Sequence, residues 1–555
     1  MTSIYFTYNI FDKDKELSNL IYSKHCSNPD PYEIIEIKEN TFISIQNGNK
    51  INIKNESVLA TIGNIFNMTF LKKLVKDENI DFDIDSEQSI NKILNIIATS
   101  SNNFINFLNH IDTSNLFIFI FNTDNNTIEL IQGNLGSKQI YIYKGLSDDK
   151  LWISSDLIIG EKIKNKCEEG LLKQCSIIPH NSYTKLKLYN NCWIQEVIVP
   201  IKKFNLLRAD YDHFSTYSMI RLEIRKYIYI CIEKRIHECN GNIVCFLSGG
   251  IDSSIICAII KQTLILNNFE NKFYTCCLGI EGQNQYPTDL TYAKFVAKIL
   301  NCDHSEFIIK EEDYFNNILH AIKVLESYDP YIIRSGLLCL SALEKLKKEK
   351  NINHIFTGDG IEELMGSHVH FDYSEKLLDF DEECRHLLNK INNYDIKKIQ
   401  NCATYYGIQS HFPYLDDCFV NFYLSLPIEI RNHVFANKDP KYILKEAFFD
   451  SEILPPFIFE RQNETFNDGI SSLERPWHIA LEEFIPESIY KQFKDHDSSE
   501  FPYNTPNTLE EYYYRTIFKD IWKKNDELMP PLWKPNFVSS YESSPRDLSK
   551  YYNRE

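Results

Sequence analysis

Short apolar runs of β type, separated by Asn, Asp and Gly, dominate the first 200 residues. They lie at 34–37, 42–45, 57–60, 117–121, 128–131 and 140–143. Runs of this length, bounded by turn residues, predict strands of an antiparallel, sheet-dominated domain. One helix is expected at 161–172, and the pattern becomes irregular at 199–211.

From His213 onward, long helical patterns alternate with apolar strands. An amphipathic helix is predicted at 217–238. The predicted strands are 243–247, 272–278, 304–309 and 354–357, and the predicted helices are 253–266, 290–300, 314–326 and 336–350. This alternation indicates a parallel sheet with helices on both faces. We therefore expect two domains, residues 1–205 and 206–555.

Composition narrows the class of protein. Apolar residues make up 43% of the chain and charged residues 25%, as in globular proteins. The net charge of −18 and the lack of a basic block argue against nucleic acid as a main partner. The 15 cysteines are scattered, so free buried thiols are expected. With no signal-like start and no apolar run long enough for a bilayer, we expect a cytoplasmic protein without a membrane partner.

The first segment that carries chemistry is 248–254, S-G-G-I-D-S-S, directly after an apolar strand and before a helical pattern. Glycines let the backbone approach a ligand closely, and a helix N-terminus offers unpaired N–H groups to an anion. Serine hydroxyls add donors, and Asp252 is a carboxylate ligand of the kind that Mg²⁺ prefers. The segment therefore predicts a pyrophosphate grip, although S-G-G alone is equally an ordinary turn between strand and helix.

A second segment, T-G-D-G-I-E-E at 357–363, follows the fourth predicted strand. Two glycines flank one acid, and two further acids open a helix, where they also serve as helix caps. Ligands of parallel sheets bind at the carboxyl ends of strands. Ser248 and Gly358 both fall at such ends, so we expect both segments to line one cleft.

Together these segments resemble the glutamine-hydrolysing asparagine synthetases, whose synthetase domain carries the PP-loop of the ATP pyrophosphatases. Further similar segments follow in order at 289–306, 326–334, 412–416, 441–445, 461–469 and 501–506. The resemblance covers roughly residues 215–550. It implies an α+β N-terminal domain with Ntn-hydrolase-like antiparallel sheets and an α/β C-terminal domain with a parallel, adenine nucleotide α-hydrolase-like sheet.

The resemblance also implies ATP and Mg²⁺ as cofactors, and ATP, aspartate and ammonia as small-molecule substrates. Aspartate would become β-aspartyl-AMP with release of pyrophosphate, and ammonia would displace AMP. The implied nucleotide-binding residues are Leu247, Ser248, Gly249, Gly250, Asp252, Ser253, Ser254, Leu278 and Gly358. Asp252 and Glu362 would bind Mg²⁺, Asp359 and Lys441 would be catalytic, and Asp329 and Arg334 would hold substrate.

Some of these positions carry a plainer alternative or depart from the family pattern. Leu278 is equally well interpreted as a core residue. The alternative for Lys441 is a solvated surface lysine, which is the more common situation of a lysine. Asp359 stands where the family has Glu, and Glu362 where it has Asp; a displacement of about 1 Å costs on the order of 100-fold in rate, so we expect slowed chemistry. The segment 409–411 (Q-S-H) replaces the family's E-A-R.

The N-terminal half lacks the family's glutaminase chemistry. Thr2 follows Met1 where the nucleophilic Cys belongs, and Thr with a terminal amine is a weak alternative. Phe42 replaces an Arg, Ile62 an oxyanion-binding Asn, Asn64 a Glu, and Gly133 an acid. An oxyanion donor alone is worth about 100- to 1000-fold in rate. We therefore predict a degenerate class II glutamine amidotransferase-like domain beside a synthetase fed by ammonia.

Two other functions stay open. One is a β-lactam-forming synthetase with the same domains. The segments 501–506 and 544–546 argue against it, because they look more like those of asparagine synthetases. The other is a weakened or inactive synthetase-like protein that binds a nucleotide or a partner, which the altered 357–363 and 409–411 segments favour. The sequence is compatible with a homodimer but does not fix the oligomeric state. His368 and His370 are interpreted as surface histidines.

Overall fold

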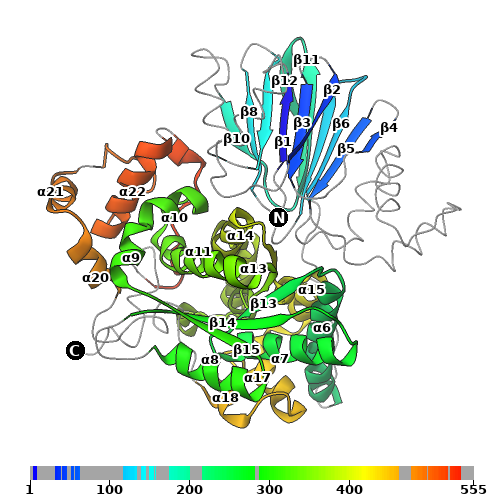
Figure 1. Cartoon of the computed structure of the whole chain (residues 1–555), viewed down its shortest axis with the longest axis vertical. Helices are drawn as coiled ribbons and strands as arrows, with labels where there is room; N and C mark the ends of the chain where they lie inside the picture. Colours follow the sequence, from blue (N-terminus) through cyan, green and yellow to red (C-terminus); the bar gives the residue numbers. More distant parts are fainter. Residues whose placement is uncertain are drawn as a thin grey trace, which may run out of the picture. The chain divides into compact units, whose positions relative to one another are not determined.

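The computed structural model describes residues 4–8, 32–38, 41–46, 52–54, 57–62, 117–133, 139–145, 149–155, 157, 174–200, 215–281, 287–461, 477–496, 498–522 and 525–538. The chain forms two compact units, Met1–Phe204 and Asn205–Glu555. Each is described below by itself (Figure 1).

The first unit contains two six-stranded antiparallel sheets. One has the order β10-β8-β9-β1-β3-β2, with β1 Ile4–Tyr8, β2 Tyr32–Lys38, β3 Thr41–Gln46, β8 Tyr141–Lys144, β9 Leu151–Ser154 and β10 Gln174–Ile177. The other has the order β12-β11-β7-β6-β5-β4, with β4 Asn52–Lys54, β5 Ser57–Ile62, β6 Phe117–Asn122, β7 Thr127–Gln132, β11 Ser182–Tyr189 and β12 Cys192–Pro200.

The two sheets share one apolar core, in which Phe6 of β1 packs 4.9 Å from Phe119 of β6, ring centroid to ring centroid. This is the antiparallel architecture predicted for an Ntn-hydrolase-like domain. Strands β1, β4, β9, β10, β11 and β12 were not predicted. In β11 and β12, Lys, Glu and Gln interrupt the apolar runs. The helix expected at 161–172 lies outside the described residues.

The second unit is built on a five-stranded parallel sheet of order β15-β14-β13-β16-β17, as predicted for an α/β domain. Its strands are β13 Asn242–Phe246, β14 Phe273–Ile280, β15 Asp303–Ile309, β16 Ile352–Phe356 and β17 Gln409–His411. Helices α7 (Ile251–Leu266) and α8 (Thr288–Ile299) cover one face, and α11 (Pro330–Lys350) and α14 (Asp395–Tyr405) cover the other (Figure 1).

Two helices and one strand in this unit depart most from the predictions, each for a local reason. The helix predicted at 314–326 is two helices, α9 Glu311–Asn316 and α10 Ile318–Leu325, which part at Asn317. Helix α11 starts at Pro330 because the Asp329 side chain caps it by accepting a bond from the Tyr331 amide. The polar three-residue strand β17 gave no apolar run to detect.

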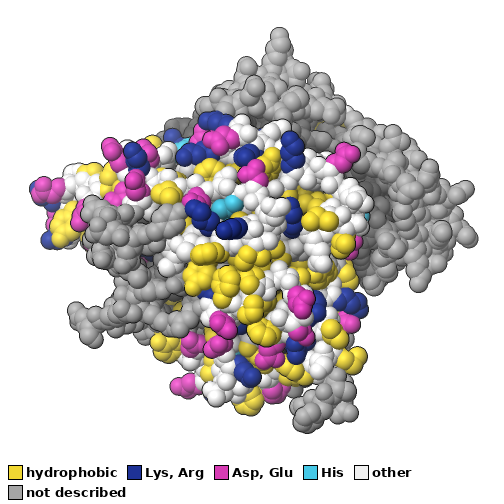
Figure 2. Space-filling model, turned by 60° about the horizontal axis from the view of Figure 1, so that its bottom comes forward, with side chains coloured by type: hydrophobic (Ala, Val, Ile, Leu, Met, Phe, Trp, Pro, Cys, Tyr) yellow, Lys and Arg dark blue, Asp and Glu magenta, His cyan; other side chains and the backbone are white. Residues whose placement is uncertain are grey.

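The remaining helices surround this framework. They are α6 Ser215–His237, α12 Ile361–Met365, α13 Leu377–Lys390, α15 Asp417–Ser425, α16 Ile428–Arg431, α17 Tyr442–Phe448, α18 Pro456–Glu460, α20 Trp477–Phe484, α21 Glu487–Asp495 and α22 Leu509–Trp522. Among the helices described, none has the length and apolar character that a membrane crossing requires. On the face shown in Figure 2, acidic and basic side chains are interspersed among apolar ones.

Candidate active site

A cavity of about 240 Å³ lies at the carboxyl ends of β13 and β16, where the two segments were predicted to meet. Most of the predicted site residues line it: Leu247, Ser248, Gly250, Asp252, Ser253, Leu278, Gly358, Asp359, Glu362 and Lys441. Gly249, Ser254, Asp329 and Arg334 are not among the lining residues. Gly358 fits tightly, since a Cβ there would lie 3.2 Å from the Cβ of Asp252.

Hydroxyl groups and one left-handed glycine shape the loop between β13 and α7. Gly249 has φ +75°, a conformation that side chains disfavour. The Ser248 and Ser253 hydroxyl oxygens lie 3.1 Å apart, and the Gly250 amide donates to Ser248 Oγ at 3.2 Å. Arg461 donates to the Ser248 carbonyl at 2.9 Å and forms an ion pair with the buried Asp289 at 2.6 Å, so its guanidinium ties the loop to helix α8.

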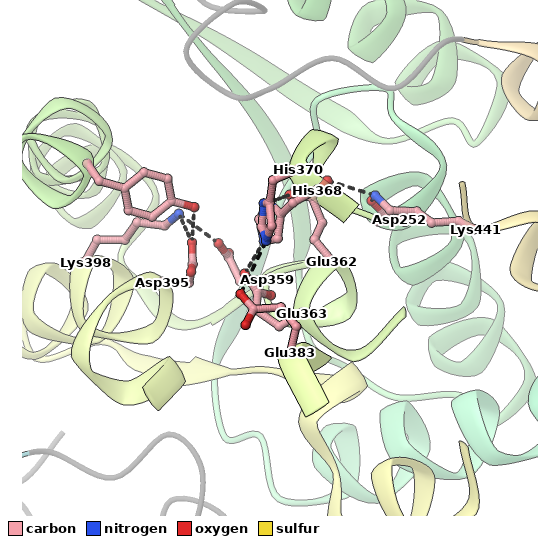
Figure 3. A network of polar contacts seen from close by, with 11 residues as sticks. Asp252, Asp359, Glu362, Glu363, His368, His370, Glu383, Asp395, Lys398 and Lys441 are labelled. Carbon is pink, nitrogen blue, oxygen red and sulfur yellow. Dashed lines mark hydrogen bonds and ion pairs between the residues drawn. The ribbon is translucent and has the colours of Figure 1, made fainter. Parts of the chain in front are cut away.

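One lysine joins the two predicted metal ligands (Figure 3). Lys441 Nζ lies 2.6 Å from Asp252 Oδ2 and 3.0 Å from Glu362 Oε1. Burial by itself disfavours the ammonium, but the charges of Asp252 and Glu362 outweigh it and raise the pKa of Lys441. Burial raises the pKa of Asp252 in spite of Lys441. Lys441 is thus a buried, permanently charged group, and not a solvated surface lysine.

The backbone around this cluster is built to hold it. Lys441 has φ 60°, a left-handed conformation that costs a non-glycine residue about 1–2 kcal/mol, and it directly precedes helix α17. Tyr414 supports the other partner by donating its hydroxyl to the Asp252 carbonyl at 2.9 Å. The backbone therefore holds the ammonium of Lys441 inside the cavity, although a lysine side chain is flexible enough to reach solvent.

The carboxylates of this cluster fit a divalent cation. Asp252 Oδ1 is buried and has no hydrogen-bond partner among the described residues, so it keeps free lone pairs at the cavity. Oxygen ligands of this kind are what Mg²⁺ prefers. Asp252 and Glu362 therefore supply donors of the type that the predicted Mg²⁺ site requires.

A second charged network includes Asp359 and reaches residues that the sequence did not point to. Lys398 Nζ lies 3.3 Å from Asp359 Oδ1 and 3.0 Å from Asp395 Oδ1, and the Tyr331 hydroxyl donates to Asp395 at 2.7 Å (Figure 3). Burial opposes the charge of Lys398, but the two acids outweigh it and raise its pKa. Asp359 is thus fixed by a buried ammonium at the cavity wall.

His368 and Glu363 link the two networks. His368 Nε2 lies 2.8 Å from Glu363 Oε1, and His368 Nδ1 lies 3.7 Å from Glu362 Oε2. Burial and the charge of Asp395 raise the pKa of Glu363 to about 7. Burial opposes a charged imidazole, but the carboxylates of Glu363 and Glu362 outweigh it and raise the pKa of His368 to about 9. The cavity therefore holds a charged histidine beside two acids.

The histidine interpretation based on sequence was wrong. The side chain of His368 is 10% exposed and that of His370 is fully buried, 3.4 Å from Glu383. Neither is a surface histidine, because the short helical turn Val369–Tyr373 folds this segment inward.

Asp329 and Arg334 do not reach the cavity. Asp329 accepts from the Tyr331 amide at 2.9 Å and from the Trp533 amide at 2.7 Å. Arg334 forms a two-point ion pair with the buried Glu510. Because both charged groups are already paired inside the protein, the geometry does not favour the substrate-holding role predicted for them.

Other predictions concern positions that the structure treats differently. Ser254 is fully buried inside α7. Leu278 is 5% exposed and lines the cavity, so it is a core residue, and its contact with a nucleotide stays a prediction. Predictions for Thr2, Asn64, 462–469 and 544–546 lie outside the described residues, as does the side chain of Phe42.

The family model of asparagine synthase matches residues 223–381 and 372–542, which together are more than half of the chain. The chain belongs to the asparagine synthase family. The matched region contains every residue of the cavity described above.

Curated relatives agree with this assignment. The glutamine-hydrolysing asparagine synthetase of Gallus gallus is 29% identical over 332 residues, 60% of this chain and 58% of that protein. The enzymes of Rattus norvegicus (30%) and Homo sapiens (29%) each match over 320 residues, 58% of this chain and 56% of theirs. The chain thus spans well under two thirds of the length of these asparagine synthetases.

Solved structures add little to the assignment. A glutamine PRPP amidotransferase from B. subtilis matches 56% of this chain and 91% of its own with a TM-score of 0.30 and 9% identity. An NH3-dependent NAD synthetase from Campylobacter jejuni matches 32% of this chain and 80% of its own with a TM-score of 0.20 and 16% identity. Similarities this low carry no argument about function.

Proposed function

We propose that the chain is an ATP-dependent asparagine synthetase that converts aspartate to asparagine through β-aspartyl-AMP. The observation that carries the proposal is the buried Asp252–Lys441–Glu362 cluster beside the loop 248–254, at the carboxyl end of β13. Phosphoryl chemistry of this kind depends mainly on positioning and on neutralising charge. Family membership supports the same reaction class.

The chain's own residues would act as follows. The loop hydroxyls and amides of 248–253 bind the β- and γ-phosphates, and Arg461, ion-paired with Asp289, holds the loop at the Ser248 carbonyl. The aspartate carboxylate oxygen attacks the α-phosphorus, and pyrophosphate leaves next to the ammonium of Lys441. Asp252 and Glu362 would hold Mg²⁺, which supplies charge neutralisation of the phosphate oxygens when bound.

The second step concerns the opposite wall of the cavity. Ammonia attacks the acyl carbon, the C–O bond to AMP breaks, and the proton lost by the nitrogen passes to a base. Asp359 is the carboxylate held at this wall by Lys398, so we assign it this proton or the charge that develops with it. Its shorter side chain, compared with the family's Glu, would slow the step.

We further propose that ammonia is the nitrogen source. In the first unit, Ile62 ends strand β5 and Gly133 follows β7, and both stand where the family carries polar groups that bind glutamine or its oxyanion. The sheets are kept while these groups are replaced, so the unit would serve as a scaffold.

The test is pyrophosphate release with ATP, Mg²⁺ and aspartate, with asparagine measured under ammonium or glutamine. We expect pyrophosphate release that depends on aspartate, and asparagine formation with ammonium alone.

The variant Lys441→Met should lower kcat by more than about 100-fold, as loss of a preorganised charge does. Its control Lys438→Met, at an exposed lysine, should leave kcat unchanged. Equal asparagine formation with glutamine would contradict the ammonia proposal, and no aspartate-dependent release would support the inactive nucleotide-binding alternative. Release with an aspartate analogue only would support a β-lactam-forming enzyme.

A further inference from the structure

Away from the cavity, three side chains with metal-binding atoms meet inside the second unit. Cys239 follows helix α6, His354 lies in the middle of β16, and His411 ends β17. Their Sγ and imidazole nitrogen atoms all lie within 4.8 Å of one another, and the residues are 6%, 6% and 2% exposed. His411 belongs to the Q-S-H segment that departs from the family pattern and that the proposed reaction does not use.

Two of the three separations between ligand atoms are close to those around a tetrahedral zinc ion. His354 Nδ1 lies 3.1 Å from His411 Nε2, and Cys239 Sγ lies 3.7 Å from the same nitrogen. Zinc–nitrogen bonds of about 2.0–2.1 Å and zinc–sulfur bonds of about 2.3 Å place neighbouring ligand atoms about 3.3–3.6 Å apart in a tetrahedron. The His354–His411 and Cys239–His411 separations each lie within a few tenths of an ångström of these values, and the ligand atoms of Cys239 and His354 lie within 4.8 Å of each other.

The hydrogen bonds fix the tautomer of His354, and in the metal-free protein His411 Nε2–H donates to its Nδ1, so a metal ion would replace that shared proton. His354 Nε2 lies 3.0 Å from the Asn240 carbonyl oxygen, which only accepts, so Nε2 carries the proton and Nδ1 faces His411 with its lone pair. Such a bond from the far nitrogen to a carbonyl is the usual support of a metal-bound histidine. Burial lowers the pKa of His354 to about 4 and that of His411 well below its usual range, which keeps both imidazoles neutral.

The Cys239 thiol is protonated in the metal-free protein, where it donates to the Arg235 carbonyl at 3.1 Å. Burial raises the pKa of Cys239, and the charge of Glu238 adds to this, whereas the guanidinium of Arg235 works against it. Lys347 lowers the pKa of His354 and Arg235 that of His411, and Arg235 shares the single carboxylate of Asp416 with Lys234. A bound cation would release the thiol proton and gain a thiolate ligand.

A neighbouring cluster is a poorer candidate. Cys231, Asp416 and Cys418 also lie within ligand distance of one another. However, Asp416 is already ion-paired with both Lys234 and Arg235, so a further cation would meet two fixed positive charges there.

We propose that Cys239, His354 and His411 bind one Zn²⁺ ion that fastens the edge strand β17 to β16 and to the end of α6, with a water as the fourth ligand. The position gives the ion a structural role. Strand β17 leads directly into 413–415, where Tyr414 donates to the Asp252 carbonyl of the nucleotide loop. A metal ion bound to β17 would thus help to fix the position of Tyr414 and, through it, of the loop 248–254. This proposal does not depend on the proposed reaction.

The test is direct metal binding to the full chain after chelator treatment. Co²⁺ should give one thiolate-to-cobalt charge-transfer band per chain, which Zn²⁺ removes, and Zn²⁺ should raise the midpoint of thermal unfolding. Cys239→Ser should lose the band and weaken binding by more than about 100-fold, since even outer-shell changes cost 10- to 100-fold. His411→Gln should weaken binding similarly while keeping the thiol.

Cys384→Ser, at a buried cysteine elsewhere, is the matched control and should bind as the wild type does. Circular dichroism of each metal-free variant checks that it is folded. Absence of the band and of the thermal shift in the wild type would overturn the proposal. So would a band that persists in Cys239→Ser but is lost in Cys418→Ser, because the metal would then sit at the neighbouring cluster.

Discussion

Substituting either glycine of the nucleotide loop tests how the structure shapes it. The sequence pattern treats Gly249 and Gly250 alike, but their environments differ. A Cβ on Gly249 would lie 2.4 Å from Tyr292 Cβ, 2.5 Å from the Tyr292 carbonyl carbon and 2.6 Å from the Ala293 amide nitrogen of helix α8. A Cβ on Gly250 would meet only Ser248 Oγ, at 3.3 Å.

The expected cost of Gly249→Ala follows from two terms. Its φ of +75° costs an alanine about 1–2 kcal/mol. The overlap requires the loop and α8 to separate by about 1 Å, and overpacking of this kind costs about 1–3 kcal/mol. We expect a loss of about 2–5 kcal/mol in the free energy of unfolding, together with about 100-fold in kcat from the displaced loop.

Gly250→Ala is the matched control. Gly250 has φ −69° and ψ 161°, which alanine adopts freely, so the free energy of unfolding should change by less than about 1 kcal/mol. Urea unfolding followed by circular dichroism, with pyrophosphate release on the same samples, measures both quantities. If Gly249→Ala unfolds like Gly250→Ala, the contact with α8 does not constrain the loop and the reasoning is refuted.

Three further predictions concern the charged groups. Glu510→Gln should cost about 3–5 kcal/mol in urea unfolding, because it leaves the buried Arg334 charge unpaired, while the KM for aspartate should not change; a raised KM with normal stability would restore the substrate role. Glu363 raises the pKa of His368 to about 9, so the charged imidazole should add at most about 3 kcal/mol to the free energy of unfolding. This contribution should be complete below about pH 6.5 and be lost as pH rises through 9. A His368→Gln variant with the same pH dependence of unfolding would contradict this. Asp359→Glu should raise kcat by up to about 100-fold if the shorter acid limits the second step, and a lower kcat would exclude that cause.

The sequence predicted the sheet and helices of the second unit because each of these elements has a continuous apolar pattern of its own. Strands such as β13 and helices such as α7 are continuous apolar patterns, and parallel topology places the loop 248–254 next to 357–363. The short polar strand β17 has no such pattern. Its place at the sheet edge is set by pairing with β16, which only the fold shows.

The sequence did not indicate Asp395 and Lys398, again because their roles depend on contacts between distant segments. Asp395 and Lys398 lie on α14, where an acid and a lysine three positions apart are typical of a solvated helix face. Burial against Tyr331 and Asp359 turns them into site residues, and no local pattern announces that. Conversely, Arg334 matched the family segment and yet pairs with Glu510, 176 positions later.

The cap on helix α11 has a consequence for the order in which the protein matures. Asp329 is completed by the backbone amide of Trp533, whose ring stacks 4.9 Å from that of Tyr331. Trp533 is made 204 residues after Asp329, so during synthesis the wall that positions Tyr331 and Asp395 waits for a late segment to arrive. A nascent chain that stops short of Trp533 would already contain the loop 248–254 but would lack one of the two amides that donate to Asp329, so the cap on α11 is completed only after Trp533 is made.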